Sequence, residues 1–274
     1  MPELPEIEAL RQSLGPRLLR QRVERLNINQ RKGYMLRCPA ETLRAELPGR
    51  TVAGVARRGK HLLLELASDE GNASFLIVNP MLAGRFALGP ESAKPPANWV
   101  FGLGLASSHA LHYMDARDMG RVYWTANPQQ DVPGWAELGP EADSLPEVGL
   151  DAFRQRWRRY RGEVKDILRN QAFLCGIGNA YSDEVLFAAH LLPLRRRTSL
   201  TPEDEARLFE AIPSVLKAAV TAIQANPNYV ESKQDRAFMA VHGKGGGTCP
   251  RCGHRISQIG SDREPMNFCR GCQS

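Results

Sequence analysis

The sequence predicts an α+β multidomain protein with a β-rich first half, a helical second half and a cysteine-rich tail. Three observations carry this prediction. Short runs of β-forming residues, bounded by turn residues, recur between residues 50 and 124. Apolar residues at helical spacing replace them from residue 151 to residue 224. Four of the six cysteines then lie in the last 26 residues.

The first half is expected to form an N-terminal β-sandwich or barrel preceded by one helix. Ile7, Leu10, Leu14 and Leu18 recur at helical spacing, which predicts a helix over residues 5–19. The predicted strands are residues 50–55, 60–66, 74–78, 99–105, 110–114 and 121–124.

A linker is predicted next, because residues 125–152 contain six acidic residues, no basic residue and four prolines. Helices are expected over residues 151–160, 163–170, 179–189 and 202–224, with Asp151, Asn179 and Thr201 as N-caps and a kink at Pro213. We therefore expect four parts: a β-rich domain over residues 1–126, the acidic linker over 127–150, a helical bundle over 151–240 and a cysteine-rich tail over 241–274.

Charge and composition favour a nucleic-acid partner and argue against membranes. The 274 residues carry a net charge of +6 and an isoelectric point near 9.1, which favours polyanionic partners. No apolar run approaches the roughly 18 residues of a membrane helix, and the first eight residues hold three glutamates and no basic residue. We expect a cytoplasmic protein of a reducing cytosol with no membrane partner.

The tail carries the pattern Cys249-x2-Cys252-x16-Cys269-x2-Cys272, in which two thiolate pairs can meet one tetrahedral ion. One structural zinc ion is the favoured interpretation, because four ligands leave no open position for catalysis. An iron–sulfur cluster and a redox dithiol are the alternatives.

Residues 176–179 (GIGN) precede a predicted helix, so backbone N–H groups at the helix start are able to hold a phosphate. A tight turn is the alternative. The surrounding basic residues favour nucleic-acid contact over a merely solvated face. They are Arg154, Arg156, Arg158, Arg159, Arg161, Lys165, Arg169 and Arg195–Arg197.

The amino terminus has its own chemistry. Removal of Met1 would leave Pro2 as a secondary amine beside the carboxylates of Glu3 and Glu6. Such an amine attacks an electrophilic sugar carbon to give an iminium, and a carboxylate shuttles the protons. Taken alone, Met-Pro-Glu is an ordinary beginning of a protein.

Taken together, residues 2–8 (PELPEIE), residues 176–184 (GIGNAYSDE) and the four-cysteine hairpin change that interpretation. The chain resembles the formamidopyrimidine-DNA glycosylase/endonuclease VIII family over nearly its whole length. The resemblance implies an N-terminal β-sandwich, a helix-two-turn-helix bundle and a C-terminal zinc-finger β-hairpin, with DNA held between the lobes.

The resemblance also implies roles for single residues. Pro2 would be the nucleophile at C1′ of the damaged nucleotide, Glu3 the acid/base and Glu6 its support. Lys60 matches the strand lysine that contacts phosphate near the lesion, and Asn179, after Gly178, matches the asparagine that binds backbone phosphate. Base loss would be followed by strand cleavage through β,δ-elimination, on a base flipped out of the stack.

Two loops depart from the family pattern. Residues 79–84 are NPMLAG where HLGMSG is usual, so Asn79 replaces a histidine and Leu82 the void-filling methionine. Residues 115–120 are DARDMG where DPRRFG is usual: Arg117 is retained, Asp118 reverses a charge and Met119 replaces an aromatic wedge. The charge reversal is expected to weaken duplex affinity.

Two further departures lie towards the carboxyl end. Residues 225–242 are short for the loop that caps oxidised purines, and Arg263, the candidate zinc-hairpin arginine, lies six rather than five residues before Cys269. Together with the changed loops, they suggest a shifted substrate: oxidised pyrimidines, bulky or crosslinked bases, or lesions in single strands.

The sequence thus predicts a monomeric bifunctional DNA glycosylase/AP lyase of base excision repair that acts on damaged bases or abasic sites. One alternative is a catalytically weak or inactive paralogue that binds damaged DNA without cutting it. Another is an RNA-binding or transcriptional zinc-ribbon protein, for which Pro2 would be irrelevant.

Overall fold

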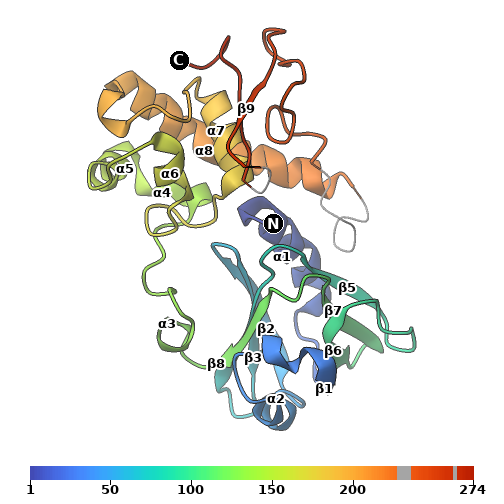
Figure 1. Cartoon of the computed structure of the whole chain (residues 1–274). Coiled ribbons are helices and arrows are strands. Elements are labelled where there is room, and N and C mark those ends of the chain that lie inside the picture. Colours follow the sequence, from blue (N-terminus) through green and yellow to red (C-terminus); the bar gives the residue numbers. More distant parts are fainter. Residues whose placement is uncertain (227–235, 262–263) are drawn as a thin grey trace. The chain divides into compact units, whose positions relative to one another are not determined.

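The computed structural model describes residues 1–226, 236–261 and 264–274, which divide into two compact units (Figure 1). The first unit holds Met1–Pro2, Glu6–Ala136 and Asn226. The second holds Glu3–Pro5, Glu137–Ala225 and the described residues from 236 onward. Half of the predicted short loop over residues 225–242, residues 227–235, lies outside the described residues.

The first unit is the predicted β-sandwich, made of two four-stranded antiparallel sheets. One sheet has the order β2-β3-β4-β8 and the other β1-β6-β7-β5. The bounds are β1 Val23–Ile28, β2 Thr51–Arg58, β3 His61–Ala67, β4 Ala73–Asn79, β5 Gly84–Pro90, β6 Trp99–Leu105, β7 His109–Asp115 and β8 Arg121–Thr125. The predictions missed β1 and β5, because four of the six residues of β1 are not buried and β5 contains two glycines and a proline.

Helix α1 (Leu4–Leu18) confirms the first predicted helix, and its residues Ile7, Leu10, Leu14 and Leu18 join the core of the first unit. Leu4, at its start, instead belongs to the core of the second unit. The shorter elements of the first unit are η1 Gln30–Met35, α2 Ala40–Glu46 and α3 Pro128–Asp131.

The second unit is the predicted helical bundle followed by a cysteine hairpin. Its helices are η2 Ala142–Ser144, α4 Leu145–Val148, α5 Leu150–Trp157, α6 Val164–Arg169, α7 Asn179–Ala188, η3 Arg197–Ser199 and α8 Pro202–Gln224. The segment predicted as a linker, residues 127–150, contains α3, η2 and α4, and α5 begins at its last residue. Helix α8 has the predicted bounds and continues through Pro213. The hairpin pairs β9 (Ser257–Ile259) with β10 (Met266–Phe268).

One of the three predicted N-caps is confirmed. The Thr201 side chain accepts the Asp204 N–H in a capping box at the start of α8. The other two predictions are wrong: α5 begins after Gly149, and Asn179 is the first residue of α7 rather than its cap. Within the described part of the chain, no helix combines the length and the apolarity needed to cross a membrane.

Candidate functional site

A carboxylate of this chain occupies the start of α7. Glu3, 1% exposed, accepts the N–H groups of Gly178 (2.6 Å), Ala180 (3.0 Å) and Tyr181 (3.4 Å). These are N–H groups that a helix start leaves without intrahelical partners, and the positive end of the helix dipole favours an anion there. The anion in this structure is therefore Glu3 itself, where the sequence had suggested a phosphate.

The glycine turn before α7 is shaped to receive the amino-terminal segment. Gly176 has φ +105° and its carbonyl accepts the N–H of Leu4 at 3.0 Å. A Cβ at Gly176 would lie within 2.5 to 3.0 Å of Leu4 side-chain atoms, so only glycine fits there. Gln171 braces the turn, donating to the Ile177 carbonyl and accepting from the Gly176 N–H. The turn thus fixes Glu3, the neighbour of Pro2 in the sequence.

The remaining amino-terminal candidates lie in the first unit. Pro2 is buried, and Glu6 is partly buried in the first turn of α1. Met1 precedes Pro2 and is 37% exposed.

Asn179 connects α7 with the hairpin. Its Nδ2 donates to the Pro265 carbonyl at 2.8 Å, and its side chain is partly buried. Arg263, the predicted arginine of the hairpin, lies outside the described residues.

A buried polar network that the sequence did not reveal ties α6, α7 and the tail together. Lys165, predicted as a DNA-facing cation, is 0% exposed, and its ammonium bonds the Asp183 carboxylate. Asp183 also lies 2.8 Å from His242 Nδ1 and accepts the Asn267 N–H. Lys165 is thus unavailable to phosphate. The sequence signal was the adjacent acidic pair in a helix that has no other charged residue.

The next residue of α7 extends this network. The Glu184 carboxylate accepts three consecutive backbone N–H groups, of Ala240, Val241 and His242, at 2.7 to 2.9 Å. The acidic pair therefore holds the chain that leads into the cysteine hairpin.

Several other members of the predicted basic set hold the fold together. Arg156 donates to the carbonyls of Ala172 and Phe173, Arg154 pairs with Glu205, and Arg195 pairs with Asp204. Arg158, Arg159 and Arg161 are exposed and remain available to a polyanion.

In the first unit, strand register brings the other predicted residues to one end of the sandwich. His61, after the turn with Lys60, lies opposite Asn79, because Leu62 pairs with Val78. Asn79 in turn pairs with Arg121, and Gly84 pairs with Asp115. The turn with Lys60, the turn with Leu82 and the loop with Arg117 and Met119 therefore lie at the same end.

The altered residue Asn79 has local partners. Its Oδ1 accepts the Met81 N–H at 3.1 Å, and its Nδ2 lies 3.1 Å from His61 Nε2. Asn79 thus links the Leu82 turn to the residue after Lys60.

The loop over residues 116–120 is held by a buried carboxylate. Asp115, 0% exposed, accepts the N–H groups of Arg117 (2.8 Å), Asp118 (3.0 Å) and Gly120 (2.7 Å). These bonds hold the backbone that presents Arg117 and the 42% exposed side chain of Met119.

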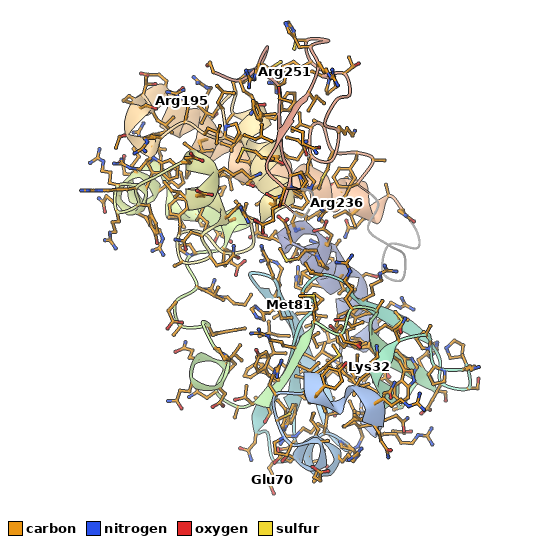
Figure 2. All side chains as sticks on the ribbon, in the orientation of Figure 1. Lys32, Glu70, Met81, Arg195, Arg236 and Arg251 are labelled. Atoms are coloured by element: carbon orange, nitrogen blue, oxygen red, sulfur yellow. The ribbon has the colours of Figure 1, made fainter. Side chains whose placement is uncertain are left out.

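Asp118 has a cation of its own. Lys32 Nζ lies 2.7 Å from Asp118 Oδ1 and also donates to the Asp115 carbonyl (Figure 2 shows Lys32). Hydrogen bonds from Lys32 and Tyr34 hold the pKa of Asp118 below its usual value, and Asp118 raises the pKa of Tyr34. The charge reversal noted in the sequence is therefore offset within the first unit.

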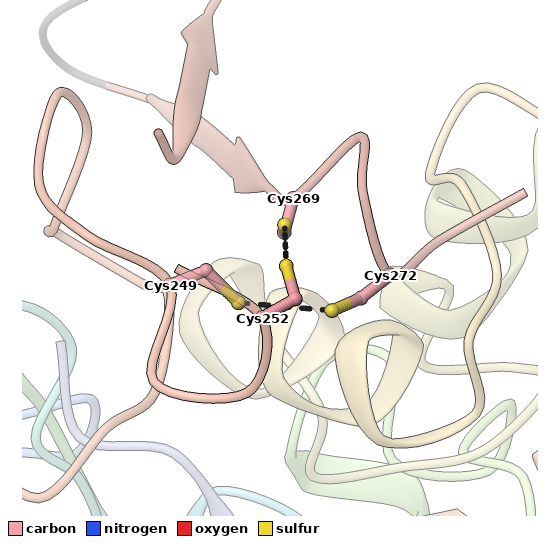
Figure 3. Close-up of side chains that lie close together, drawn as sticks. All are labelled: Cys249, Cys252, Cys269 and Cys272. Atoms are coloured by element: carbon pink, nitrogen blue, oxygen red, sulfur yellow. Dashed lines mark hydrogen bonds between the residues drawn. The ribbon is translucent and has the colours of Figure 1, made fainter. Parts of the chain in front are cut away.

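The four tail cysteines converge, as their spacing predicts (Figure 3). Their sulfur atoms all lie within 4.8 Å of one another, with Cys249 and Cys272 at 3.7 Å and Cys252 and Cys269 at 3.5 Å. Tetrahedral zinc with bonds of about 2.3 Å places its sulfur ligands roughly 3.8 Å apart. The donor set and its dimensions fit such an ion.

The chain has the architecture of the helix-two-turn-helix DNA glycosylases. It combines a β-sandwich, a helical unit whose glycine turn binds an N-terminal glutamate, and a four-cysteine hairpin. Two family models match the chain: the formamidopyrimidine-DNA glycosylase N-terminal domain over residues 1–122 and the H2TH domain of the same enzyme over residues 138–228.

Relatives that match over the whole chain belong to the same family as the two family models. The chain is 34% identical to the formamidopyrimidine-DNA glycosylase of Moorella thermoacetica over 94% of each chain. It is 33% identical to that of Heliobacterium modesticaldum over the full length of both. Two solved structures of the Lactococcus lactis enzyme cover 99% of each chain. The complex with FAPY-dG DNA gives a TM-score of 0.86 at 28% identity, and the complex with abasic-site DNA gives 0.85 at 27%.

The chain belongs to the formamidopyrimidine-DNA glycosylase/endonuclease VIII family. Membership supports a DNA glycosylase of base excision repair.

Proposed function

We propose that the chain is a bifunctional DNA glycosylase/AP lyase in which Pro2, exposed by removal of Met1, is the nucleophile. The observation that carries the proposal is the environment of Glu3: a buried carboxylate, fixed by three backbone N–H groups, directly follows Pro2. With Met1 attached, the Pro2 nitrogen is an amide and has no lone pair for attack, so the proposal requires the processed chain.

The chemistry follows from that pair of residues. The Pro2 nitrogen attacks C1′ and gives up its own proton to the Glu3 carboxylate, while the bond from C1′ to the base breaks with its electron pair leaving on the base, which takes up a proton from water. The nitrogen lone pair then expels the ring oxygen O4′ to form the iminium, and Glu3 supplies the proton that O4′ needs. Glu6, one helical turn further, supports this proton transfer.

The iminium acidifies C2′, and loss of a C2′ proton expels the 3′ phosphate. A second elimination expels the 5′ phosphate, so both ends of the gap carry phosphate. Hydrolysis of the iminium then returns Pro2 as a free amine.

The other predicted residues bind DNA in this proposal. Lys60 and Asn179 contact phosphate near the lesion, Asn179 next to Gly178 in the glycine turn. Arg117 neutralises phosphate, while Leu82 and Met119 occupy the space vacated by the flipped nucleotide. For the residues of the first unit, the support is that their turns lie at one end of the sandwich and that Asp115 holds the loop of Arg117 and Met119. Arg263 keeps its predicted role from the sequence alone.

Zinc is the proposed metal, held by Cys249, Cys252, Cys269 and Cys272. With four protein ligands it would stabilise the hairpin fold and take no part in the reaction. A set of four thiolates with sulfur atoms at these separations supports this assignment.

Cleavage of an abasic-site duplex by the processed protein tests the proposal. We expect a one-nucleotide gap with phosphate at both ends, and loss of cleavage with retained binding in Glu3→Gln. Tight binding of the abasic duplex without any cleavage would contradict it and favour the non-cutting paralogue.

A further inference from the structure

Tyr34 is an exposed aromatic residue at the end of the first unit that carries Lys60, Arg117 and Met119. Its side chain is 58% exposed, more than any other large hydrophobic residue in the described part of the chain. It lies in η1, whose following residue Leu36 forms a bridge with Val122 at the start of β8. Tyr34 is therefore a neighbour of the 116–120 loop.

The exposed apolar side chains of this end form one group. Among the described residues, seven large hydrophobic side chains are exposed, and three of them are Tyr34, Leu82 (36%) and Met119 (42%). Gly84 and Gly120, which end the two loops, both approach the Tyr113 hydroxyl too closely to admit a Cβ. The Leu82 turn and the Met119 loop are thus in close proximity, with Tyr34 beside the second.

An anchored carboxylate lies beside the Tyr34 hydroxyl. Asp118 raises the pKa of Tyr34, so its carboxylate lies near the Tyr34 hydroxyl, and Asp118 is itself anchored by Lys32, whose Nζ also donates to the carbonyls of Asn98 and Asp115. A tyrosine side chain has only two rotatable bonds before its ring, so it loses little conformational freedom when a ligand stacks on it.

Positive charge surrounds this apolar group. Arg31, Arg37, Arg117 and Arg121 are exposed, and within the described ranges none of the four forms a salt bridge. An exposed aromatic ring among unpaired guanidinium groups fits a ligand with flat apolar faces and a polyanionic backbone. Single-stranded or unpaired nucleotides have that chemistry.

We propose that Tyr34 contacts DNA directly, its ring stacking on a base of the bound strand beside Met119. The inference rests on the proposed function and extends it: at position 119 the chain has methionine, and Tyr34 supplies an aromatic surface from a different segment.

Binding of a duplex with a tetrahydrofuran abasic analogue, measured by fluorescence anisotropy from 50 to 200 mM salt, tests the inference. Loss of one base stack weakens binding roughly 5- to 150-fold, so we expect about a tenfold loss in Tyr34→Ala. The salt dependence should stay that of the parent, because stacking releases no counterions. Arg117→Ala, in contrast, should lower the slope by about one unit.

Two controls separate the ring from its surroundings. Tyr34→Phe keeps the ring and loses only the hydroxyl near Asp118, so it should bind within about twofold of the parent. Leu19→Ala removes another exposed side chain, 47% exposed. Leu19 lies at the opposite end of the sheet β2-β3-β4-β8, where the Arg20 N–H donates to the Val52 carbonyl, so the variant should bind DNA as the parent does. Equal losses in Tyr34→Phe and Tyr34→Ala would overturn the inference, since the hydroxyl would then carry the effect.

A 2-aminopurine probe placed in turn at each position flanking the abasic analogue locates the stacked base. We expect quenching at one position in the parent and its loss in Tyr34→Ala. A parent that binds and cuts while Tyr34→Ala matches it in affinity and quenching would overturn the inference alone. A parent that does not bind the duplex would overturn the proposed function with it.

Discussion

Breaking the buried pair of Lys165 and Asp183 should destabilise the second unit severely. Their side chains are 1% and 0% exposed, so Lys165→Met leaves an uncompensated carboxylate inside the bundle. Removing one partner of a buried ion pair costs about 3–5 kcal/mol. Asp183 keeps its contacts with His242 and Asn267, which places the expected loss near 3 kcal/mol.

Urea unfolding followed by circular dichroism measures this loss, because α5 to α8 all lie in the second unit. With a slope of about 2 kcal/mol per molar urea, the midpoint should fall by about 1.5 M. The double variant with Asp183→Asn should recover part of the loss, because it removes the buried charge. Lys217→Met, an exposed lysine on α8, is the matched control and should change the free energy of unfolding by less than about 0.5 kcal/mol. A Lys165→Met variant as stable as Lys217→Met would show that the buried ion pair does not stabilise the bundle.

Three further predictions concern other parts of the chain. Burial raises the pKa of Glu8, but hydrogen bonds from Arg11, Gln12 and Arg57 outweigh burial, so the pKa is lowered overall. The stability that ionised Glu8 contributes is therefore present above pH 4.5 and lost as the pH falls through the folded-state pKa. In urea titrations the difference in unfolding free energy between the parent and Glu8→Gln should disappear in acid, and a constant difference from pH 7 to pH 3 would count against this prediction. Gly176→Ala places a side chain at a positive φ and against Leu4, so it should lower the free energy of unfolding by about 2 kcal/mol or more. The control Gly71→Ala, at φ +84° with open space around it, should lower it by about 1 kcal/mol. Equal losses in the two variants would be inconsistent with the close approach of Leu4 to Gly176. Chelation should release one zinc ion per chain, expose the four tail thiols to alkylation and abolish DNA binding, and unchanged binding by the metal-free protein would speak against the hairpin's role.

Local signals predicted the elements whose structure depends on nearby residues. Helix α8 has the predicted bounds because Thr201, with Asp204 three residues later, forms a capping box that is visible in the sequence. The cysteine site was equally predictable, since its two CxxC pairs carry the ligand geometry in their spacing.

Long-range partners decided the features that the sequence did not reveal. The start of α7 is capped by Glu3, 175 residues before Gly178, so a local rule chose Asn179 wrongly. Lys165 lies in a run of basic residues that looks exposed in the sequence, but it is buried because it pairs with Asp183 on another helix. Lys32 offsets Asp118 from a distant segment in the same way.

Trapping the covalent intermediate identifies the nucleophile. Processed protein is incubated with an abasic-site duplex and borohydride, and the reduced adduct is digested and sequenced by mass spectrometry. We predict a sugar fragment on the nitrogen of an N-terminal Pro2 and none in protein that retains Met1. An adduct on a lysine, or no adduct from a folded chain that begins at Pro2, would show that Pro2 is not the nucleophile.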